Sequence, residues 1–375
     1  MSSNAPNGNE ARTVRTTSAA QAEALRSGAL PRPEQVADGV WAIAAPVPEG
    51  GVSYTLSYVL LGADSTFHLV DPGWDSPENL TALHRSLAEI GLSLPQLATI
   101  IATHHHPDHL GIARRLQGIT GAALVLSRAE RAVLTHQLSP ERRDPASYAR
   151  TVEAWGVPAE RRAELTESFA RVPVYTDVEP DLLLVDGEPL QLDGHRLITV
   201  ATPGHTGGHL CFVDHRRGII YGGDHVLPQI YPGVGLGALP GEESLTDYLT
   251  SLQTLKQFAD YEVLPGHEFR FRGLDVRVDD IIRHHLRRTR RVADLLAELG
   301  GAPVWEYARR LQWTSGWGRL GGFYLHSALR QTEMHLELAR GGLLEGLVER
   351  YPEPQPEPDA GAPAAVSAAV AGTSD

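Results

Sequence analysis

Short apolar runs separated by turn residues recur along most of the chain. In the first half, runs rich in β-branched and aromatic residues between glycines and prolines predict strands. They lie at 40–45, 54–61, 66–70, 97–102 and 122–126. Apolar residues at helical spacing, from Leu80 to Ile90, predict a helix over 77–90, and a second helix is expected over 109–117.

The strand pattern is interrupted once and then resumes. Residues 127–175 have polar-faced helical patterns without strand signals, so we expect an inserted helical lid there. Further strands are predicted at 182–185, 189–192, 196–201, 209–213, 218–221 and 262–264. A helix is predicted over 245–258. This mixture of strands and helices indicates the α/β class.

The two ends of the chain differ from this central part. Residues 1–35 are polar and poor in aromatic residues, which predicts a disordered N-terminal segment. Residues 271–350 predict a C-terminal helical module, including a long helix with an arginine-rich face. Residues 351–375 are rich in proline and alanine and predict a disordered tail. The catalytic domain is therefore expected over 36–270.

Charge and cysteine content limit the possible partners and compartment. Of the formal net charge of −13, residues 1–35 carry +1, 271–350 carry +3 and 351–375 carry −4, so residues 36–270 carry −13. This acidic balance disfavours nucleic acid as a partner. Cys211 is the only cysteine, which fits a cytoplasmic protein, and no apolar stretch or leader pattern predicts a membrane span or a signal peptide.

The segment Thr103-His104-His105-His106-Pro107-Asp108-His109 carries the strongest chemical signal. It follows a predicted buried strand and opens a helix. His104 and His106 are two residues apart, so their side chains point the same way on an extended backbone and can share one metal ion. Asp108 and His109 lie where the helix begins and can face a second ion. Imidazole and carboxylate ligands suit zinc, and also iron or manganese.

Three more candidate ligands follow predicted strands, each beside glycines that let a loop approach a metal closely. These are His205 in Pro203-Gly204-His205, Asp224 in Gly222-Gly223-Asp224, and His267 in Pro265-Gly266-His267. His209 is expected to support the His205 loop. Ligands that converge from one sheet edge onto one cleft are what an α/β active site requires.

The order and spacing of these segments over 36–270 resemble the motifs of the metallo-β-lactamase superfamily, with Asp71 after a strand. The pattern is most similar to the hydroxyacylglutathione hydrolase and β-lactamase-like-protein-2 group. The resemblance implies a four-layer αββα sandwich and, for the C-terminal extension, a winged-helix-like module. It also implies two divalent ions, with zinc favoured. Asp71 and Thr103 would orient the ligands through hydrogen bonds without binding a metal themselves.

The resemblance assigns a role to each ligand. His104, His106 and His205 would hold the first ion. Asp108, His109 and His267 would hold the second, and Asp224 would bridge the two. A hydroxide bound between two metal ions is a nucleophile near neutral pH, and Asp108 is the best candidate for handling the proton. The residues that contact substrate are not readable from the sequence.

The ligand set also narrows the reaction. Asp224 disfavours β-lactam hydrolysis, because the true β-lactamase branches replace this residue, and His106 disfavours the diiron flavoprotein branch, which has Glu there. The expected function is hydrolysis of a thioester or ester of a small-molecule or carrier-bound acyl substrate, such as acyl-CoA, an acyl carrier or acyl-glutathione. The alternatives are a lactonase, an RNA phosphodiesterase or, least favoured, a non-catalytic metal-binding protein.

Overall fold

The computed structural model describes residues 13–48, 51–170, 177–237, 239, 241–313, 316–341, 346 and 349–351. Its central feature is a pair of seven-stranded sheets. The first sheet has the order β2-β3-β4-β5-β6-β7-β8. Its strands are β2 (Glu34–Ala37), β3 (Val40–Pro46), β4 (Tyr54–Leu61), β5 (Phe67–Val70), β6 (Leu97–Ile101), β7 (Ala123–Ser127) and β8 (Leu182–Leu184).

The second sheet has the order β1-β14-β13-β12-β11-β10-β9. Its strands are β9 (Pro189–Leu192), β10 (His195–Ala201), β11 (Leu210–Asp214), β12 (Ile219–Gly223), β13 (Glu262–Pro265), β14 (Phe271–Arg272) and the N-terminal β1 (Arg15–Thr16). β5, β6, β7 and β8 run parallel to one another, and β12 runs parallel to β13. The loops that follow β5 and β6, and those that follow β12 and β13, therefore leave each sheet at a common edge.

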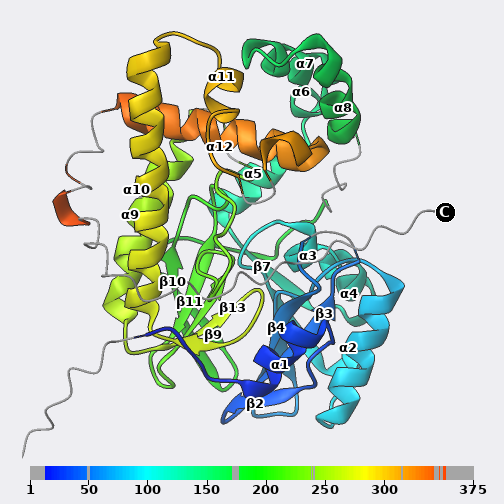
Figure 1. Ribbon diagram of the computed structural model, residues 1–375. Helices are drawn as coiled ribbons and strands as arrows, with labels where there is room; N and C mark the ends of the chain where they lie inside the picture. Colours follow the sequence, from blue (N-terminus) through cyan, green and yellow to red (C-terminus); the bar gives the residue numbers. More distant parts are fainter. Residues whose placement is uncertain are drawn as a thin grey trace, which may run out of the picture.

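Helices cover the outer face of each sheet and complete four layers, as the resemblance implied (Figure 1). α2 (Pro77–Glu89) and α4 (Ala113–Thr120) pack on the first sheet. α9 (Ser244–Leu255) and the first half of α10 (Leu274–Leu299) pack on the second. Between the sheets lies a core of buried aromatic and aliphatic side chains, in which Tyr58 and Tyr221 meet edge to face with ring centroids 5.5 Å apart. Three short 3₁₀ helices lie at η1 (Leu94–Gln96), η2 (Lys256–Phe258) and η3 (Trp317–Arg319).

The remaining helices form a separate unit beyond the sheets (Figure 1). They are α5 (Arg128–Gln137), α6 (Pro140–Arg143), α7 (Pro145–Ala154), α8 (Ala159–Ala170), α11 (Val304–Ala308) and α12 (Gly322–Arg340). The short helix α3 (Pro107–Leu110) lies instead beside α4, and its Leu110 packs in the core of the first sheet. Tyr148, Trp155 and Leu165 of the insertion share one buried cluster with Trp305 and Leu329 of the C-terminal region. The insertion that the sequence predicts as a lid is thus one half of a larger helical unit.

The C-terminal region is helical, as predicted. From Gly273 to Tyr351, the described residues contain helices only, so the β-wing of a winged-helix module is not found among them. None of the helices in the described part of the chain is both long and apolar enough to cross a membrane. Tyr351 is buried against the core beside α9 and α10, and the predicted tail after it, 352–375, lies outside the described residues.

The prediction of a disordered N-terminal segment is wrong for residues 13–35. β1 pairs with β14, and α1 (Ala19–Ser27) begins at Ser18, whose hydroxyl accepts a hydrogen bond from the backbone of Gln21 at 3.0 Å. The Gln21 side chain in turn accepts the backbone N–H of Arg270 at 2.9 Å. This polar segment is ordered because its hydrogen-bonding groups find partners some 250 residues away, which composition does not reveal. Residues 1–12 lie outside the described part.

The shared cluster predicts that the two halves of the helical unit depend on each other. Leu329 on α12 is fully buried among α7 and α8 side chains. Replacing Leu329 with alanine should destabilise the protein by about 2–5 kcal/mol, because it removes buried methyl groups and leaves a cavity. Amide hydrogen exchange should accelerate in α7 and α8 more than in β4 and β6. Equal acceleration in the sheets would show that the helical unit is not a distinct cooperative unit.

Candidate metal centre

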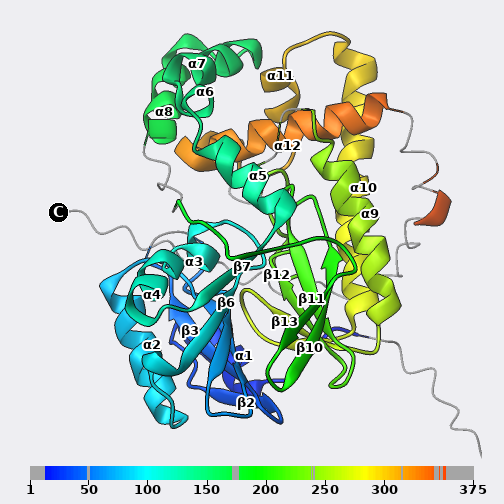
Figure 2. The same cartoon turned by 180° about the vertical axis from the view of Figure 1, so that it is seen from behind.

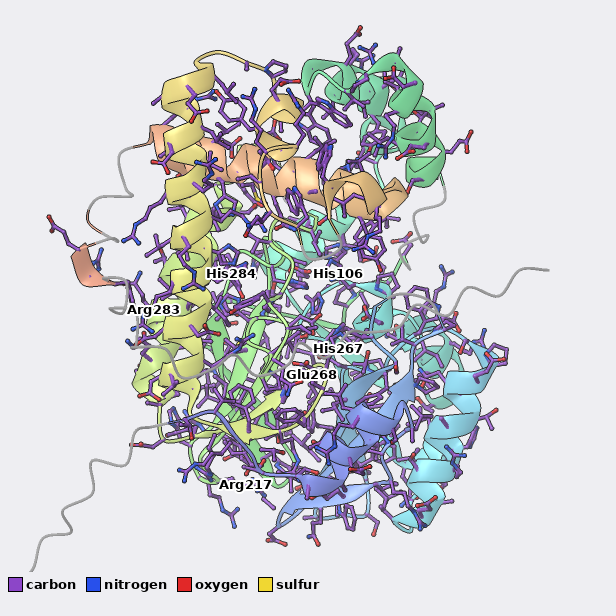
Figure 3. All side chains as sticks on the ribbon, viewed as in Figure 1. His106, Arg217, His267, Glu268, Arg283 and His284 are labelled. Atoms are coloured by element: carbon purple, nitrogen blue, oxygen red, sulfur yellow. The ribbon has the colours of Figure 1, made fainter. Side chains whose placement is uncertain are left out.

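The predicted ligands come together where the sheet edges meet the helical unit. Figure 3 shows His106 and His267 near the middle of the molecule, whereas Arg217 lies at the far end of the sandwich. His104 and His106 follow β6, and His205 follows β10. Asp224 follows β12, and His267 follows β13. Three overlapping groups of side chains have ligand atoms within 4.8 Å of one another: His104, His106 and His205; His104, His109 and Asp224; and Asp108, His109 and His267.

The first group consists of three imidazoles. The Nε2 atom of His104 lies 2.9 Å from Nδ1 of His106, which lies 3.1 Å from Nε2 of His205. The other ring nitrogen of each residue has a fixed partner. The Leu236 carbonyl faces Nε2 of His106 at 3.1 Å, and the Gly233 carbonyl faces Nδ1 of His205 at 2.7 Å. Since a carbonyl only accepts, these ring nitrogens must donate.

His104 is oriented in the same manner through Thr103. The Thr103 hydroxyl donates to Asp71 at 2.8 Å, so it accepts from Nδ1 of His104 at 2.9 Å. In neutral imidazole only one nitrogen carries a hydrogen. The nitrogens of His104, His106 and His205 that face one another are therefore all lone-pair acceptors.

Asp108, His109 and His267, called the second group from here on, combine two imidazoles with a carboxylate. Asp108 Oδ2 lies 3.3 Å from Nε2 of His267 and 3.8 Å from Nε2 of His109. Nδ1 of His109 bonds Asp71 at 3.0 Å, and Nδ1 of His267 bonds the Tyr54 carbonyl at 2.8 Å. Both Nε2 atoms again present lone pairs when the rings are neutral. Asp108 is the most exposed member of this group, with 17% of its side chain accessible.

Asp224 lies between the two groups. Its carboxylate oxygens lie 3.2 Å from Nε2 of His267, 3.3 Å from Nε2 of His109 and 3.7 Å from Nε2 of His205. Its backbone N–H donates to Nε2 of His209 at 3.3 Å, and His209 Nδ1 contacts Thr202 at 2.8 Å. His209 thus lies outside the ligand set and contacts both the loop that carries Asp224 and the segment that leads to His205.

These contacts fit divalent cations. Five imidazoles and two carboxylates converge in a buried space. His104, His106 and His205 face one another with lone pairs only, which is unfavourable unless a positive charge lies between them. The buried Nε2 atom of His109 and the Oδ1 atom of Asp224 face each other at 3.3 Å. Imidazole and carboxylate together are the ligands that zinc, iron and manganese accept in hydrolases.

The electrostatics differ between the two groups. Burial lowers the pKa of His104 and His106 well below the ordinary value, which keeps them neutral and able to bind a metal. Burial acts in the same direction on His267, but the carboxylates of Asp224 and Asp108 outweigh it and raise the pKa of His267 to about 10. The negative charge of the centre is therefore concentrated at the second group.

Asp71 connects the two groups from behind. Its backbone is left-handed (φ 53°). One carboxylate oxygen accepts the Thr103 N–H at 2.8 Å, and the other accepts both the Thr103 hydroxyl and the N–H at Nδ1 of His109.

Replacing Asp71 with asparagine, which tolerates this backbone, should weaken metal affinity about 10- to 100-fold. Competition with a chromophoric chelator measures this. Unchanged affinity would show that the ligands need no support from Asp71.

Sequence reasoning missed several groups that orient the ligands. The carbonyls of Tyr54, Gly233 and Leu236 carry no signal in residue type. The buried Glu130 bonds His105, between two predicted ligands, at 2.8 Å and 2.5 Å. Ser127 and Glu130 do have the spacing of a helix capping box, which marks the start of α5. That spacing does not reveal that the Glu130 carboxylate turns toward the metal loop.

Comparison with known proteins indicates the family to which this chain belongs. A family model described as the metallo-beta-lactamase superfamily matches residues 50–267, more than half of the chain. The chain belongs to the metallo-beta-lactamase superfamily. Members of this superfamily are hydrolases, and the His and Asp groups described above suggest that this one binds divalent metal.

Individual relatives match well beyond the metal motifs. The β-lactamase-like protein 2 homolog of Caenorhabditis elegans is 27% identical over 71% of this chain and 73% of its own. An atrochrysone carboxyl ACP thioesterase of Aspergillus fumigatus is 24% identical over 70% of this chain and 50% of its own. A metallo-beta-lactamase family protein from Thermus thermophilus, known from its crystal structure, is 30% identical, with a TM-score of 0.67 over 83% of this chain and 95% of that one.

Proposed function

We propose that this superfamily hydrolase cleaves acyl thioesters, with CoA, an acyl carrier protein or a small thiol as the leaving group. Two divalent ions, most simply zinc, would be held by the seven converging ligands. Such ions polarise a carbonyl and acidify a bound water near neutral pH. The observation that carries the proposal is the set of seven converging side chains, in which one ring nitrogen of each of the five imidazoles bonds a fixed partner and the other faces the centre.

The roles of the chain's own residues follow from their positions. Hydrolysis adds water across the acyl C–S bond and releases a carboxylic acid and a thiol. The partly exposed carboxylate of Asp108 is placed to take the proton of that water and pass it to the departing sulfur. Asp224 and the histidines bind and orient, and the helical unit beside the centre would limit access of bulk water.

Similarity and surface charge favour a thioester over the alternatives. One relative that matches most of this chain is named a thioesterase, which makes this class of substrate a reasonable expectation here. Three arginines of helix α10 already have partners, which reduces the charge that they offer to an RNA. Arg288 packs over the Trp313 ring at 4.3 Å, Arg283 lies 3.9 Å from Asp279 and Arg291 lies 4.0 Å from Asp294.

A substrate panel on metal-loaded protein tests the proposal. It contains acyl-CoA, acyl-glutathione and acyl-carrier-protein thioesters, a lactone, a cephalosporin and single-stranded RNA. The His106→Ala, Asp108→Ala double variant serves as the control. We expect thiol release from at least one thioester by the native protein and none from the control. RNA cleavage or lactone opening without thioester turnover would contradict the proposal and move the function to that alternative.

A further inference from the structure

The first turn of α5 lies directly against two metal-binding loops. Glu130 in this turn has a fully buried side chain, and its carboxylate accepts hydrogen bonds from two parts of the chain. One oxygen accepts the backbone N–H of His105 at 2.8 Å and contacts its Nδ1 at 2.5 Å. The other accepts the Thr206 hydroxyl at 3.0 Å. Glu130 thus connects residues 25 and 76 positions away in the sequence.

Both partners of Glu130 are neighbours of metal ligands. His105 lies between His104 and His106, and its ring centroid is 5.1 Å from that of His106. Thr206 directly follows His205. The three imidazoles of the first group therefore belong to two loops, and the Glu130 carboxylate links those loops.

The packing around Glu130 leaves little room for these loops to shift. Ser127, which begins α5, donates its hydroxyl to the Gly208 carbonyl at 2.6 Å and accepts the Glu130 N–H at 2.7 Å. A Cβ atom on Gly208 would lie 2.0 Å from the backbone nitrogen of Glu130, and one on Gly237 would lie 2.6 Å from the His105 ring. Only glycine permits these close approaches, so helix and loops are fitted to each other.

α5 also reaches the helical unit at its other end. His136 and Gln137 line a cleft of about 680 Å³ together with residues of α7, α12 and the segment around Gly235 and Gly237. Figure 2 shows α5 crossing from the sheet edge near β7 to this unit. The helix that forms one wall of the cleft is therefore attached by Glu130 to the loops of the first metal group.

We propose that Glu130 is a positioning residue that fixes the geometry of the first metal site by holding the His104–His106 loop and the His205 loop in register. Its carboxylate does not reach a metal. It acts through His105 and Thr206, so its loss should alter how the three imidazoles bind an ion. This role depends on the metal centre and does not depend on the thioester substrate proposed above.

Metal binding by Glu130 variants tests this role. We expect Glu130→Ala to weaken zinc affinity about 10- to 100-fold, as is typical for residues that orient ligands. The visible absorption of the Co²⁺-substituted protein, which reports ligand geometry, should change as well. Glu130→Gln should stay within about threefold of native affinity, because an amide oxygen can still accept from His105. Thr135→Ala, at an exposed position of the same helix, is the matched control and should change neither quantity.

Thr206→Val keeps the proposal testable if Glu130→Ala fails to fold. It removes one hydroxyl while preserving shape, and should weaken zinc affinity by a smaller factor with a shifted Co²⁺ spectrum. Native affinity and spectrum in Glu130→Ala or Thr206→Val would overturn the proposal. So would a Glu130→Gln protein as weak as Glu130→Ala. Since these readouts need no substrate, a protein that hydrolyses no thioester but shows the expected metal effects would contradict only the proposed function.

Discussion

Replacing Asp224 with alanine should reduce hydrolysis at least roughly a thousandfold. The Asp224 carboxylate approaches histidines of both metal groups, at 3.2 Å from His267, 3.3 Å from His109 and 3.7 Å from His205. Without it, two ions would have to share the centre with only one remaining carboxylate ligand. Metal ions supply several kcal/mol of transition-state stabilisation, and each 1.36 kcal/mol corresponds to a factor of about ten in rate.

The measurement is kcat for the best substrate of the panel, together with the metal content of the purified variant. Asp214→Asn is the matched control. Asp214 is also buried, at the end of β11, but it pairs with Arg217 at 2.7 Å, at the opposite end of the sandwich (Figure 3). This control should retain native metal content and rate. An Asp224→Ala enzyme within tenfold of native activity would show that Asp224 does not bridge catalytic ions.

Removal of metal should lower the melting temperature by roughly 10 °C. In the metal-free centre the lone pairs of His104, His106 and His205 face one another, and this unfavourable arrangement is relieved when cations bind. A ligand that binds only the folded state stabilises it by about 4 kcal/mol when its free concentration is a thousand times its Kd. Two ions would therefore stabilise the folded state by about 8 kcal/mol. In a chain of this size, each kcal/mol shifts the melting temperature by roughly 1.3 °C, which gives a total shift of roughly 10 °C.

Thermal unfolding with and without a chelator measures the effect, and adding zinc back should reverse it. The His106→Ala, Asp108→Ala double variant provides the control, because it removes one ligand from each group. Its melting temperature should respond much less to the chelator. A native protein with the same melting temperature under both conditions would contradict a metal centre that contributes to folding.

Several elements could be predicted because their signals are local. The apolar run 97–102 corresponds to β6 (Leu97–Ile101), and the helical spacing over 77–90 corresponds to α2 (Pro77–Glu89). Burial on one face imposes these periodicities, so they remain visible in the sequence alone. The N-terminal helix α1 was missed, because its order comes from contacts with β14 and Arg270 rather than from its own composition.

The inserted helices of 127–175 show a different limit of prediction from sequence. Helical patterns in 127–175 were readable, but the partner of those helices was not. Trp155 and Leu165 pack against Trp305 and Leu329, which come from a region about 150 residues later. Amphipathic helices indicate that a face must be covered, and many different surfaces could cover it. The choice between a free lid and one half of a helical unit is therefore made by tertiary packing.

The sequence by itself determined the fold class, because the strand and helix patterns are local. It also determined the seven candidate ligands, because imidazole and carboxylate residues at strand ends reflect chemistry that few other residue types can perform. Only the tertiary structure decided how those ligands are held. The carbonyls of Tyr54, Gly233 and Leu236 fix the tautomers of three histidines, and Glu130 joins two loops. A backbone carbonyl is present in every residue, and a buried glutamate looks like a surface one in sequence. Their roles arise only when distant segments come within hydrogen-bonding distance.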